Sequence, residues 1–475
     1  MKSKHVAPLV LSTAIAGLFL TQLQPSSSFA QLQPAFSFVS RDPGVRDGAA
    51  AAGGPLAGLS STQSAFFQAG AADFAEEEGV ADGLGPRMNL DSCGGCHIQP
   101  ALGGSSPHAQ LGTPPFGNVP NPQAAFAGKH GGVDHAPSFI RADGPVREAR
   151  FVKNPDGSAD GGVHALFTIT GRSGAGGCNL GQPDFATHLS NGNVIFRIPT
   201  PTFGAGLIEA IPDAAIAANQ GSNLAQKLAL GIGGKANFAV AGRTITGMTN
   251  NNGNDGTIAR FGWKAQNKSL LLFAGEAYNV EMGITNEIFQ TEREEQKDCQ
   301  FATVPNDVTN TDTSVPTEVI SAVEKFAHFM RLLDAPQPST DTPGGSWSIS
   351  RGRQTFSDVG CALCHTPSFT TGNSAIAALR YKPVNLFSDL LVHDMGDGLA
   401  DGVTQGEAGP REFRTAPLWG VGQRIFFLHD GRTADLKRAI RAHASNGSEA
   451  NGVIDNFNNL GERDKQDLLN FLRSL

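Results

Sequence analysis

The stretch of sequence that decides the fold occurs twice, as CGGCH at residues 93–97 and as CALCH at residues 361–365. Both copies read Cys-x-x-Cys-His, the pattern at which a c-type haem is attached to a polypeptide. Two thiols add to the vinyl groups of one porphyrin edge, and the histidine that follows them becomes an axial ligand of the iron. With 6 Cys and 12 His in 475 residues, chance would produce roughly 0.002 such matches.

We therefore predict two covalently bound haem c groups, each held by two thioether bonds and one histidine. The cofactor-binding residues are Cys93, Cys96, His97, Cys361, Cys364 and His365, and the two histidines are metal ligands. A redox-active thiol pair, or a zinc site shared between the two cysteine pairs, is the alternative. Neither alternative explains why a histidine follows both pairs.

The N-terminus has the features of an export signal. Lys2 and Lys4 precede a mostly apolar run over residues 6–20, and Ser28-Phe29-Ala30 supplies the small residues of a cleavage site. The apolar run is shorter than the roughly 20 residues that span a bilayer. We expect a signal peptide over residues 1–30 and a periplasmic or otherwise exported mature protein without a membrane span. An uncleaved N-terminal anchor is the alternative.

Two cysteines, Cys178 and Cys299, lie outside both motifs. In an oxidising compartment a free pair of cysteines is not expected to stay reduced, so we predict a disulfide between them. A catalytic thiol pair is the alternative.

The composition excludes several classes of protein. Charged residues make up 17% of the chain, against roughly 25% in an average globular protein, which excludes a coiled coil and a charge-driven disordered chain. The 58 glycines indicate many loops. The net charge of −8 argues against nucleic acid and anionic membranes as partners, because both require a basic surface.

Hydrophobic periodicity predicts helices around both motifs. Apolar residues recur at helical spacing over residues 62–78, over residues 316–333 and in the closing segment 462–475. Alternating patterns predict short strands at residues 165–169 and 193–198. Most of the remaining chain is expected to form loops.

Histidine and methionine are both ordinary sixth ligands of haem c. For the second haem the candidates are His393, Met395, His429 and His443. His443 ends an amphipathic segment late in the chain, roughly where small cytochrome domains place this ligand, so we take His443 as the metal ligand.

The first haem has less obvious candidates for a sixth ligand. The nearest histidines are His108, His130 and His135, and all of them lie in a segment rich in Gly and Pro. A histidine in such a loop could bind the iron in one redox state and leave it in another. We therefore expect an open or switchable first haem.

Several further motifs occur in order along the chain, and the chain resembles the bacterial di-haem oxidoreductase family through them. This family is described as di-haem peroxidases or thiol oxidoreductases and is similar to the bacterial di-haem cytochrome c peroxidases. The resemblance covers about residues 60–475. Its motifs are GLGP at 83–86, GLIEAIPD at 206–213, RFGWKA at 260–265, SDLLVHDMG at 388–396, FRTAPLW at 413–419 and FLHDGR at 427–432.

The resemblance implies a mainly α fold, with two cytochrome c-like haem domains and loop-rich and short β insertions. It implies that the C-terminal haem accepts electrons and that the N-terminal haem is the reaction centre. Glu209 matches the glutamate that the peroxidases use near the peroxide, so Glu209 is the catalytic candidate; a surface glutamate is the alternative. Trp263 and Trp419 are candidate electron relays or, alternatively, core aromatic residues.

On this basis we divide the chain into five parts. They are a signal peptide (1–30), an irregular N-terminal arm (31–62), an N-terminal haem c domain with a loop and strand insertion (63–205), a middle helical and loop region with a linker (206–345), and a C-terminal cytochrome c domain (346–475).

The expected function is that of an exported di-haem oxidoreductase that reduces hydrogen peroxide. The expected electron donor is a small cytochrome, a cupredoxin or a quinol-linked donor. A non-catalytic electron carrier, and an enzyme that oxidises a protein or thiol partner through high-valent haem, are the alternatives. A calcium ion between the domains is left open.

Overall fold

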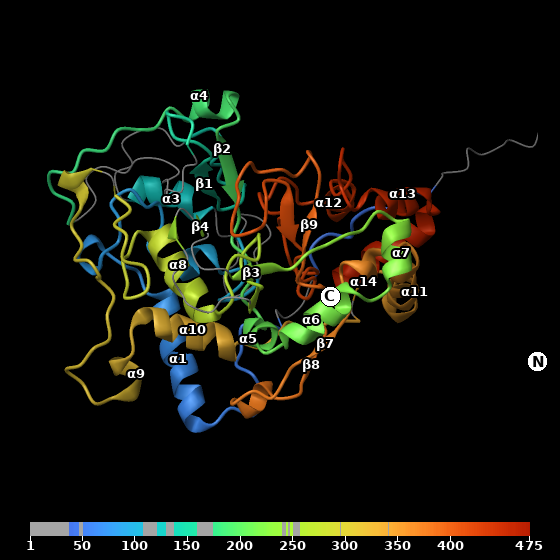
Figure 1. Ribbon diagram of the computed structural model, residues 1–475, viewed down its shortest axis with the longest axis horizontal. Coiled ribbons are helices and arrows are strands. Elements are labelled where there is room, and N and C mark those ends of the chain that lie inside the picture. The colour runs from blue at the N-terminus through green and yellow to red at the C-terminus, as the bar shows by residue number, and fades with distance from the viewer. Residues whose placement is uncertain are drawn as a thin grey trace, which may run out of the picture. The chain divides into compact units, whose positions relative to one another are not determined.

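Helices form most of the regular structure, which confirms the mainly α fold (Figure 1). The computed structural model describes residues 38–46, 51–107, 121–129, 137–158, 174–239, 244–245, 248–249, 257–294, 296–340 and 342–475. Within them, Val39–Leu475 belong to one compact unit. The expected signal peptide and the expected strand at 165–169 lie outside the described residues. The domain boundaries proposed above stay predictions.

The helices differ widely in length. Their bounds are α1 Ser61–Ala75, α2 Cys93–Cys96, α3 Pro122–Lys129, α4 Phe185–Ser190, α5 Ala205–Glu209, α6 Asp213–Gln220, α7 Leu224–Ala229, α8 Leu270–Met282, α9 Pro316–Val319, α10 Ala322–Leu332, α11 Gly345–Asp358, α12 Leu436–Arg441, α13 Asn451–Asn459 and α14 Glu462–Ser474.

The strands of the described residues form short antiparallel pairs. The pairs are β1 (Glu148–Phe151) with β2 (Val194–Arg197), β3 (Asn237–Ala239) with β6 (Thr257–Ala259), β4 (Thr244–Ile245) with β5 (Met248–Thr249), β7 (Phe369–Thr370) with β8 (Pro383–Val384), and β9 (Val392–Asp394) with β10 (Glu412–Arg414). The strand expected at 193–198 is confirmed as β2.

Helix α1 packs along α10 next to the first Cys-x-x-Cys-His motif. Phe67 and Phe74 of α1 contact Phe329 of α10, with ring centroids 5.4 Å and 4.9 Å apart. A Cβ atom on Gly70 would lie 2.2 Å from the carbonyl oxygen of Lys325. Only glycine therefore lets the two helices approach this closely.

The single helix expected over residues 316–333 is two helices. Helix α9 ends at Val319, and Ile320 is extended. Ser321 then starts α10: its hydroxyl accepts a hydrogen bond from the Glu324 amide, and the Glu324 side chain accepts one from the Ser321 amide. This reciprocal capping box favours a new helix start over a continuous helix.

Helices α11 and α14 frame the second motif. Phe356 of α11 and Phe471 of α14 have ring centroids 5.5 Å apart. Gly352 permits close contact, because a Cβ atom there would lie 1.9 Å from the carbonyl oxygen of Asp467. Helix α14 coincides with the helix predicted for the closing segment, and it buries Leu468, Leu469 and other apolar side chains.

Among the residues that the structure describes, no helix is both long enough and apolar enough to cross a bilayer.

Candidate functional site

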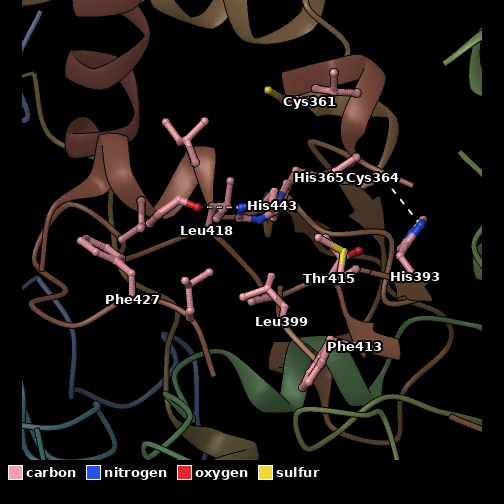
Figure 2. Close-up of a pocket in the computed structure, with 18 of the residues that line it drawn as sticks. Cys361, Cys364, His365, His393, Leu399, Phe413, Thr415, Leu418, Phe427 and His443 are labelled. Atoms are coloured by element: carbon pink, nitrogen blue, oxygen red, sulfur yellow. Dashed lines mark hydrogen bonds between the residues drawn. The ribbon is translucent and has the colours of Figure 1, made fainter. Parts of the chain in front are cut away.

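The second motif lines a cavity of about 210 Å³ (Figure 2). Cys361 and Cys364 are free thiols in its wall. The Nδ1 atom of His365 lies 3.0 Å from the carbonyl oxygen of Phe387, and because a carbonyl can only accept, Nδ1 donates. This bond leaves Nε2 as the nitrogen that can bind a metal. Burial and the nearby His443 lower the pKa of His365 to about 4, so the imidazole is neutral at neutral pH.

His443 lines the same cavity two residues after the end of α12. Its Nδ1 atom donates a hydrogen bond of 2.8 Å to the carbonyl oxygen of Ala439, and burial lowers its pKa. Two neutral imidazoles with engaged Nδ1 atoms therefore belong to one cavity (Figure 2). This arrangement supplies two nitrogen donors for a single iron.

His393 also lines this cavity, but both of its ring nitrogens are engaged. Nδ1 lies 2.7 Å from Oε2 of Glu449, and Nε2 lies 3.0 Å from Oδ2 of Asp389. Although burial opposes protonation, Asp389 raises the pKa of His393 well above its usual range. A protonated imidazole between two carboxylates has no lone pair for a metal.

The other two candidates for the sixth ligand also line the cavity of the second motif. They are Met395 and His429. The His429 ring stacks on Phe413, with centroids 4.4 Å apart, and burial lowers the pKa of His429 to about 4. Among the described residues, the His429 ring has no backbone hydrogen bond like those that orient His365 and His443, so His443 stays the predicted ligand.

The first motif lines a separate cavity of about 160 Å³. His97 repeats the geometry of His365, because its Nδ1 atom donates to the carbonyl oxygen of Gly104 at 3.0 Å. Burial lowers the pKa of His97 to about 4. Within the described part of the chain, no second histidine lines this cavity, although Met88 and Met330 do. The loop candidates His108, His130 and His135 lie outside the described residues.

Three glutamates line the first cavity, whereas Glu449 is the one glutamate among the described residues that line the second. The wall of the first cavity includes Glu148, Arg150, Glu276 and Glu281, and Arg150 pairs with Glu148 at 2.6 Å. Removal from solvent, and the nearby Glu148, raise the pKa of Glu281 to about 8. Sequence reasoning missed Glu281, whose one signal is its place at the end of the apolar helix α8.

Glu209, the sequence-based catalytic candidate, lines neither motif cavity. Its Oε2 atom accepts a hydrogen bond of 2.6 Å from Nε of Arg331, and its Oε1 accepts one of 2.8 Å from the Leu270 amide. The carboxylate therefore joins α5, α10 and the start of α8. Glu209 thus links three helices and is not among the residues that line the cavity of the first motif.

Trp263 lines both motif cavities and a smaller cavity of about 50 Å³. Its Nε1 atom donates to the carbonyl oxygen of Ile198 at 3.0 Å. Trp419 lines only the smaller cavity. Of these two candidate relays, Trp263 alone therefore lies at the boundary of both candidate cofactor sites.

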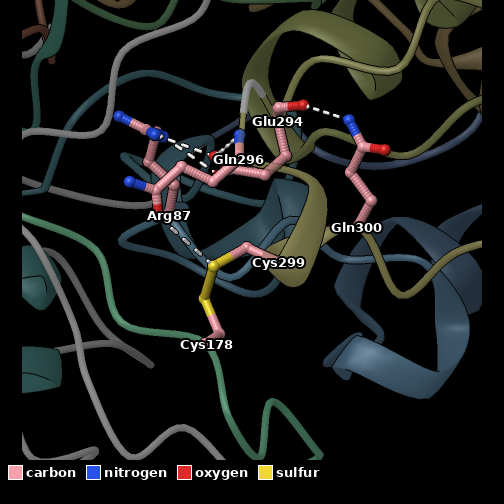
Figure 3. Close-up of a disulfide and its surroundings, with 6 residues drawn as sticks. All are labelled: Arg87, Cys178, Glu294, Gln296, Cys299 and Gln300. Carbon is pink, nitrogen blue, oxygen red and sulfur yellow. Dashed lines mark hydrogen bonds and ion pairs between the residues drawn. A yellow bond between two sulfur atoms is a disulfide. The ribbon is translucent and has the colours of Figure 1, made fainter.

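Cys178 and Cys299 form a disulfide, which confirms the expected pairing (Figure 3). The bond joins positions 121 residues apart in the sequence. Figure 3 places it near the ion pair between Arg87 and Glu294. The catalytic thiol pair considered above is wrong, because neither sulfur is free.

The residues around both motifs fit a covalently attached haem. Each cavity has two free thiols and a neutral histidine whose Nδ1 atom donates to a backbone carbonyl. Apolar side chains form most of the rest of the second cavity's wall, whereas the first cavity has apolar and polar side chains together. Calcium prefers oxygen ligands. Among the described residues, the metal-ligating group of three that could share one ion is Cys364, Asp389 and His393, which is not an all-oxygen set.

Comparison with known proteins identifies one family. A family model described as "Di-haem oxidoreductase, putative peroxidase" matches residues 170–475. The match includes the second Cys-x-x-Cys-His motif and leaves the first motif outside. No curated protein matches the chain.

Similar solved structures have low sequence identity. Hydrazine synthase from Kuenenia stuttgartiensis is 16% identical with a TM-score of 0.24. The match covers 43% of this chain and 60% of that chain. The diheme peroxidase BthA from Burkholderia thailandensis is 15% identical with a TM-score of 0.26. The match covers 45% of this chain and 65% of that chain. A MauG-like protein associated with microbial copper homeostasis is 18% identical with a TM-score of 0.28, the coverages being 58% and 90%. The chain thus spans less than two thirds of the first two proteins.

Proposed function

The chain belongs to the di-haem oxidoreductase family, and we propose that it is an exported enzyme that carries two haem c groups and reduces hydrogen peroxide or a similar small oxidant. Electrons enter at the site of Cys361, Cys364 and His365, and leave for the oxidant at the site of Cys93, Cys96 and His97. The donor is a small cytochrome, a cupredoxin or a quinol-linked carrier. An oxidoreductase function follows from the family, and the specific reaction is our proposal.

The difference between the two cavities is the observation that carries this proposal. Haem c supplies one-electron chemistry when it has two protein ligands, and it binds a small molecule when one axial position is open. His365 and His443 both line the second cavity, and the Nδ1 atom of each donates to a backbone carbonyl. In the first cavity His97 is the one histidine among the described lining residues. The second site therefore suits electron transfer, and the first suits binding of the oxidant.

Proton supply also favours the first cavity as the reaction site. Reduction of one hydrogen peroxide to two waters consumes two electrons and two protons, and both protons have to reach the peroxide oxygens. Glu281 lines this cavity, and its pKa of about 8 keeps the carboxyl largely protonated at neutral pH. A general acid with a pKa near the working pH can both give up and recover a proton. We therefore assign the proton-donor role to Glu281 in place of Glu209.

Trp263 is the candidate relay between the two sites. Its indole ring lines both cavities, and the bond from Nε1 to the Ile198 carbonyl fixes its orientation. The Arg424 guanidinium lies 5.6 Å from the ring centroid. An aromatic ring shared by two cavity walls shortens the gap that an electron has to cross.

Binding of carbon monoxide to the reduced holoprotein tests the proposal. We expect one haem of the two to bind carbon monoxide, and we expect hydrogen peroxide to be consumed at the expense of a reduced small cytochrome. A non-catalytic electron carrier would instead show two six-coordinate low-spin haems, no carbon monoxide complex and no peroxide turnover with any donor. That combination would contradict the proposed function.

A further inference from the structure

Two arginines line the second cavity without a carboxylate partner. Arg414 and Arg424 both belong to its wall and to the wall of the smaller cavity beside Trp263. No carboxylate of the described residues lies within ion-pair distance of either guanidinium. Two buried arginines elsewhere in the chain have such a partner: Arg197 bonds to Asp401 at 2.8 Å, and Arg473 to Asp42 at 2.7 Å.

Arg424 has an unsatisfied donor. Its Nε atom donates to the carbonyl oxygen of Phe426 at 2.9 Å, whereas Nη2 is buried and has no hydrogen-bond partner in the described structure. Burial lowers the pKa of Arg424 to about 10. An arginine at this pKa still carries its charge at neutral pH, so a positive charge lies in the wall with one donor unused.

Arg414 is held by backbone carbonyls and repelled by its neighbour. Nε donates to Gly262 at 2.9 Å and Nη1 to Thr415 at 3.4 Å. Burial, followed by the charge of Arg424, lowers the pKa of Arg414 to about 10. Asp389 offsets part of this effect, but the Asp389 carboxylate already accepts bonds from His393 and from the Leu391 amide.

Two like charges in a mainly apolar cavity require a counter-ion. A buried charge without a partner is strongly destabilising, and guanidinium groups bind carboxylates with paired, charge-assisted hydrogen bonds. A haem carries two propionate carboxylates, which equals the number of unpaired guanidiniums. We propose that Arg414 and Arg424 form an anion site that receives the propionates of the haem attached at Cys361 and Cys364.

The assignment also orients the haem. Both arginines belong to the part of the wall shared with the smaller cavity, where Trp263 lies 5.6 Å from the Arg424 guanidinium. Propionates bound by both arginines would lie on the side of the cavity that Trp263 also lines. This inference rests on the proposed function only in requiring that a haem is attached at the second motif.

Resonance Raman spectra and redox titrations of the holoprotein test the site. Arg414→Gln and Arg424→Gln should each shift the propionate bending vibrations, and each should lower the reduction potential of the C-terminal haem, because loss of a nearby positive charge favours ferric iron. Arg424→Lys keeps the charge but not the planar donor fork, so it should shift the vibrations and largely retain the potential. Arg432→Gln is the matched control, because Arg432 pairs with Asp430 at 2.7 Å and lines none of the three cavities.

Three outcomes separate the possibilities. Unchanged propionate vibrations in both glutamine variants, with two haems per chain by the pyridine haemochrome assay, would overturn the inference and leave the proposed function intact. A wild-type potential that depends on added phosphate would assign the site to a free anion instead and would also overturn it. If a glutamine variant does not fold, Arg424→Lys alone decides, because unshifted vibrations in it exclude the propionate contact.

Discussion

His393 and Glu449 are bound to each other through Nδ1 and Oε2 at 2.7 Å. The same Glu449 oxygen also accepts bonds from the amides of Gly233 and Gly234 at 2.9 Å, so it is fixed in place. Because Asp389 holds the other ring nitrogen, His393 is a buried cation in the wall of the second cavity. His443 is therefore left as the better oriented histidine for the iron opposite His365.

Substitution of His443 should change the spin state of the C-terminal haem. In His443→Ala the Nε2 donor is lost, so we expect the low-spin six-coordinate signal of that haem to convert to a high-spin signal in absorption and electron paramagnetic resonance spectra. His393→Gln, the matched control, should keep the low-spin signal. A low-spin haem that survives in His443→Ala, together with its loss in His393→Gln, would show that the ligand assignment is wrong.

Substitution of Glu281 should slow peroxide turnover without loss of haem. Removal of a positioned general acid typically lowers the rate about 100-fold or more, so Glu281→Gln should lose about this factor in steady-state turnover. Glu209→Gln should keep its turnover and lose about 1–2 kcal/mol of stability, because the bonds to Arg331 and to the Leu270 amide are weakened. The reverse pattern would restore Glu209 as the catalytic residue.

Glu78 should make the stability depend on pH. Tyr278 donates a hydrogen bond of 2.7 Å to Oε1 of Glu78, but burial dominates and raises the pKa of Glu78 from 4.5 to about 7. The folded state then binds a proton that the unfolded state has released, so the free energy of unfolding falls as the pH rises from 4.5 to about 7. Because the carboxyl is partly exposed, we expect a loss of about 1–2 kcal/mol rather than the full effect of the shift.

Urea unfolding of the holoprotein at about pH 5 and about pH 7.5 measures this dependence. Glu78→Gln should remove the Glu78 contribution and flatten the profile relative to the wild type. Tyr278→Phe removes the bond that favours the charged form, so its profile should extend to higher pH. Identical slopes in the wild type and Glu78→Gln would show that Glu78 titrates normally.

The disulfide should contribute measurably to stability. Removal of the bond between Cys178 and Cys299 in a double serine variant frees a long segment, because the two residues are 121 positions apart. We expect a loss of about 2–5 kcal/mol in the free energy of unfolding. Thiol titration of the denatured holoprotein should detect no free thiol before reduction, and detection of free thiols at this stage would contradict the pairing.

Local patterns in the sequence predicted the parts of the fold that depend on neighbouring residues. The spacing within CGGCH and CALCH identified both cavities, and amphipathic spacing located α14. The break between α9 and α10 was also present in the sequence, in the Ser321-x-x-Glu324 capping box. The strong apolar periodicity across residues 316–333 obscured it.

The parts of the candidate site that were not predicted depend on contacts between residues far apart in the sequence. Glu209 pairs with Arg331, 122 positions away, and the protonated His393 pairs with Glu449, 56 positions away. No short window of sequence reports such pairs. For the same reason the sequence could not show that Glu281 lines the first cavity, or that Arg414 and Arg424 line the second without a carboxylate partner.

Mass spectrometry of the purified, denatured protein tests the central claim most directly. The account predicts a polypeptide that carries two haem groups through thioether bonds, with one group lost when Cys93 and Cys96 are replaced by serine and the other lost when Cys361 and Cys364 are replaced. A polypeptide without an added haem at either paired-cysteine segment, isolated from cells that attach haem to another c-type cytochrome, would contradict it.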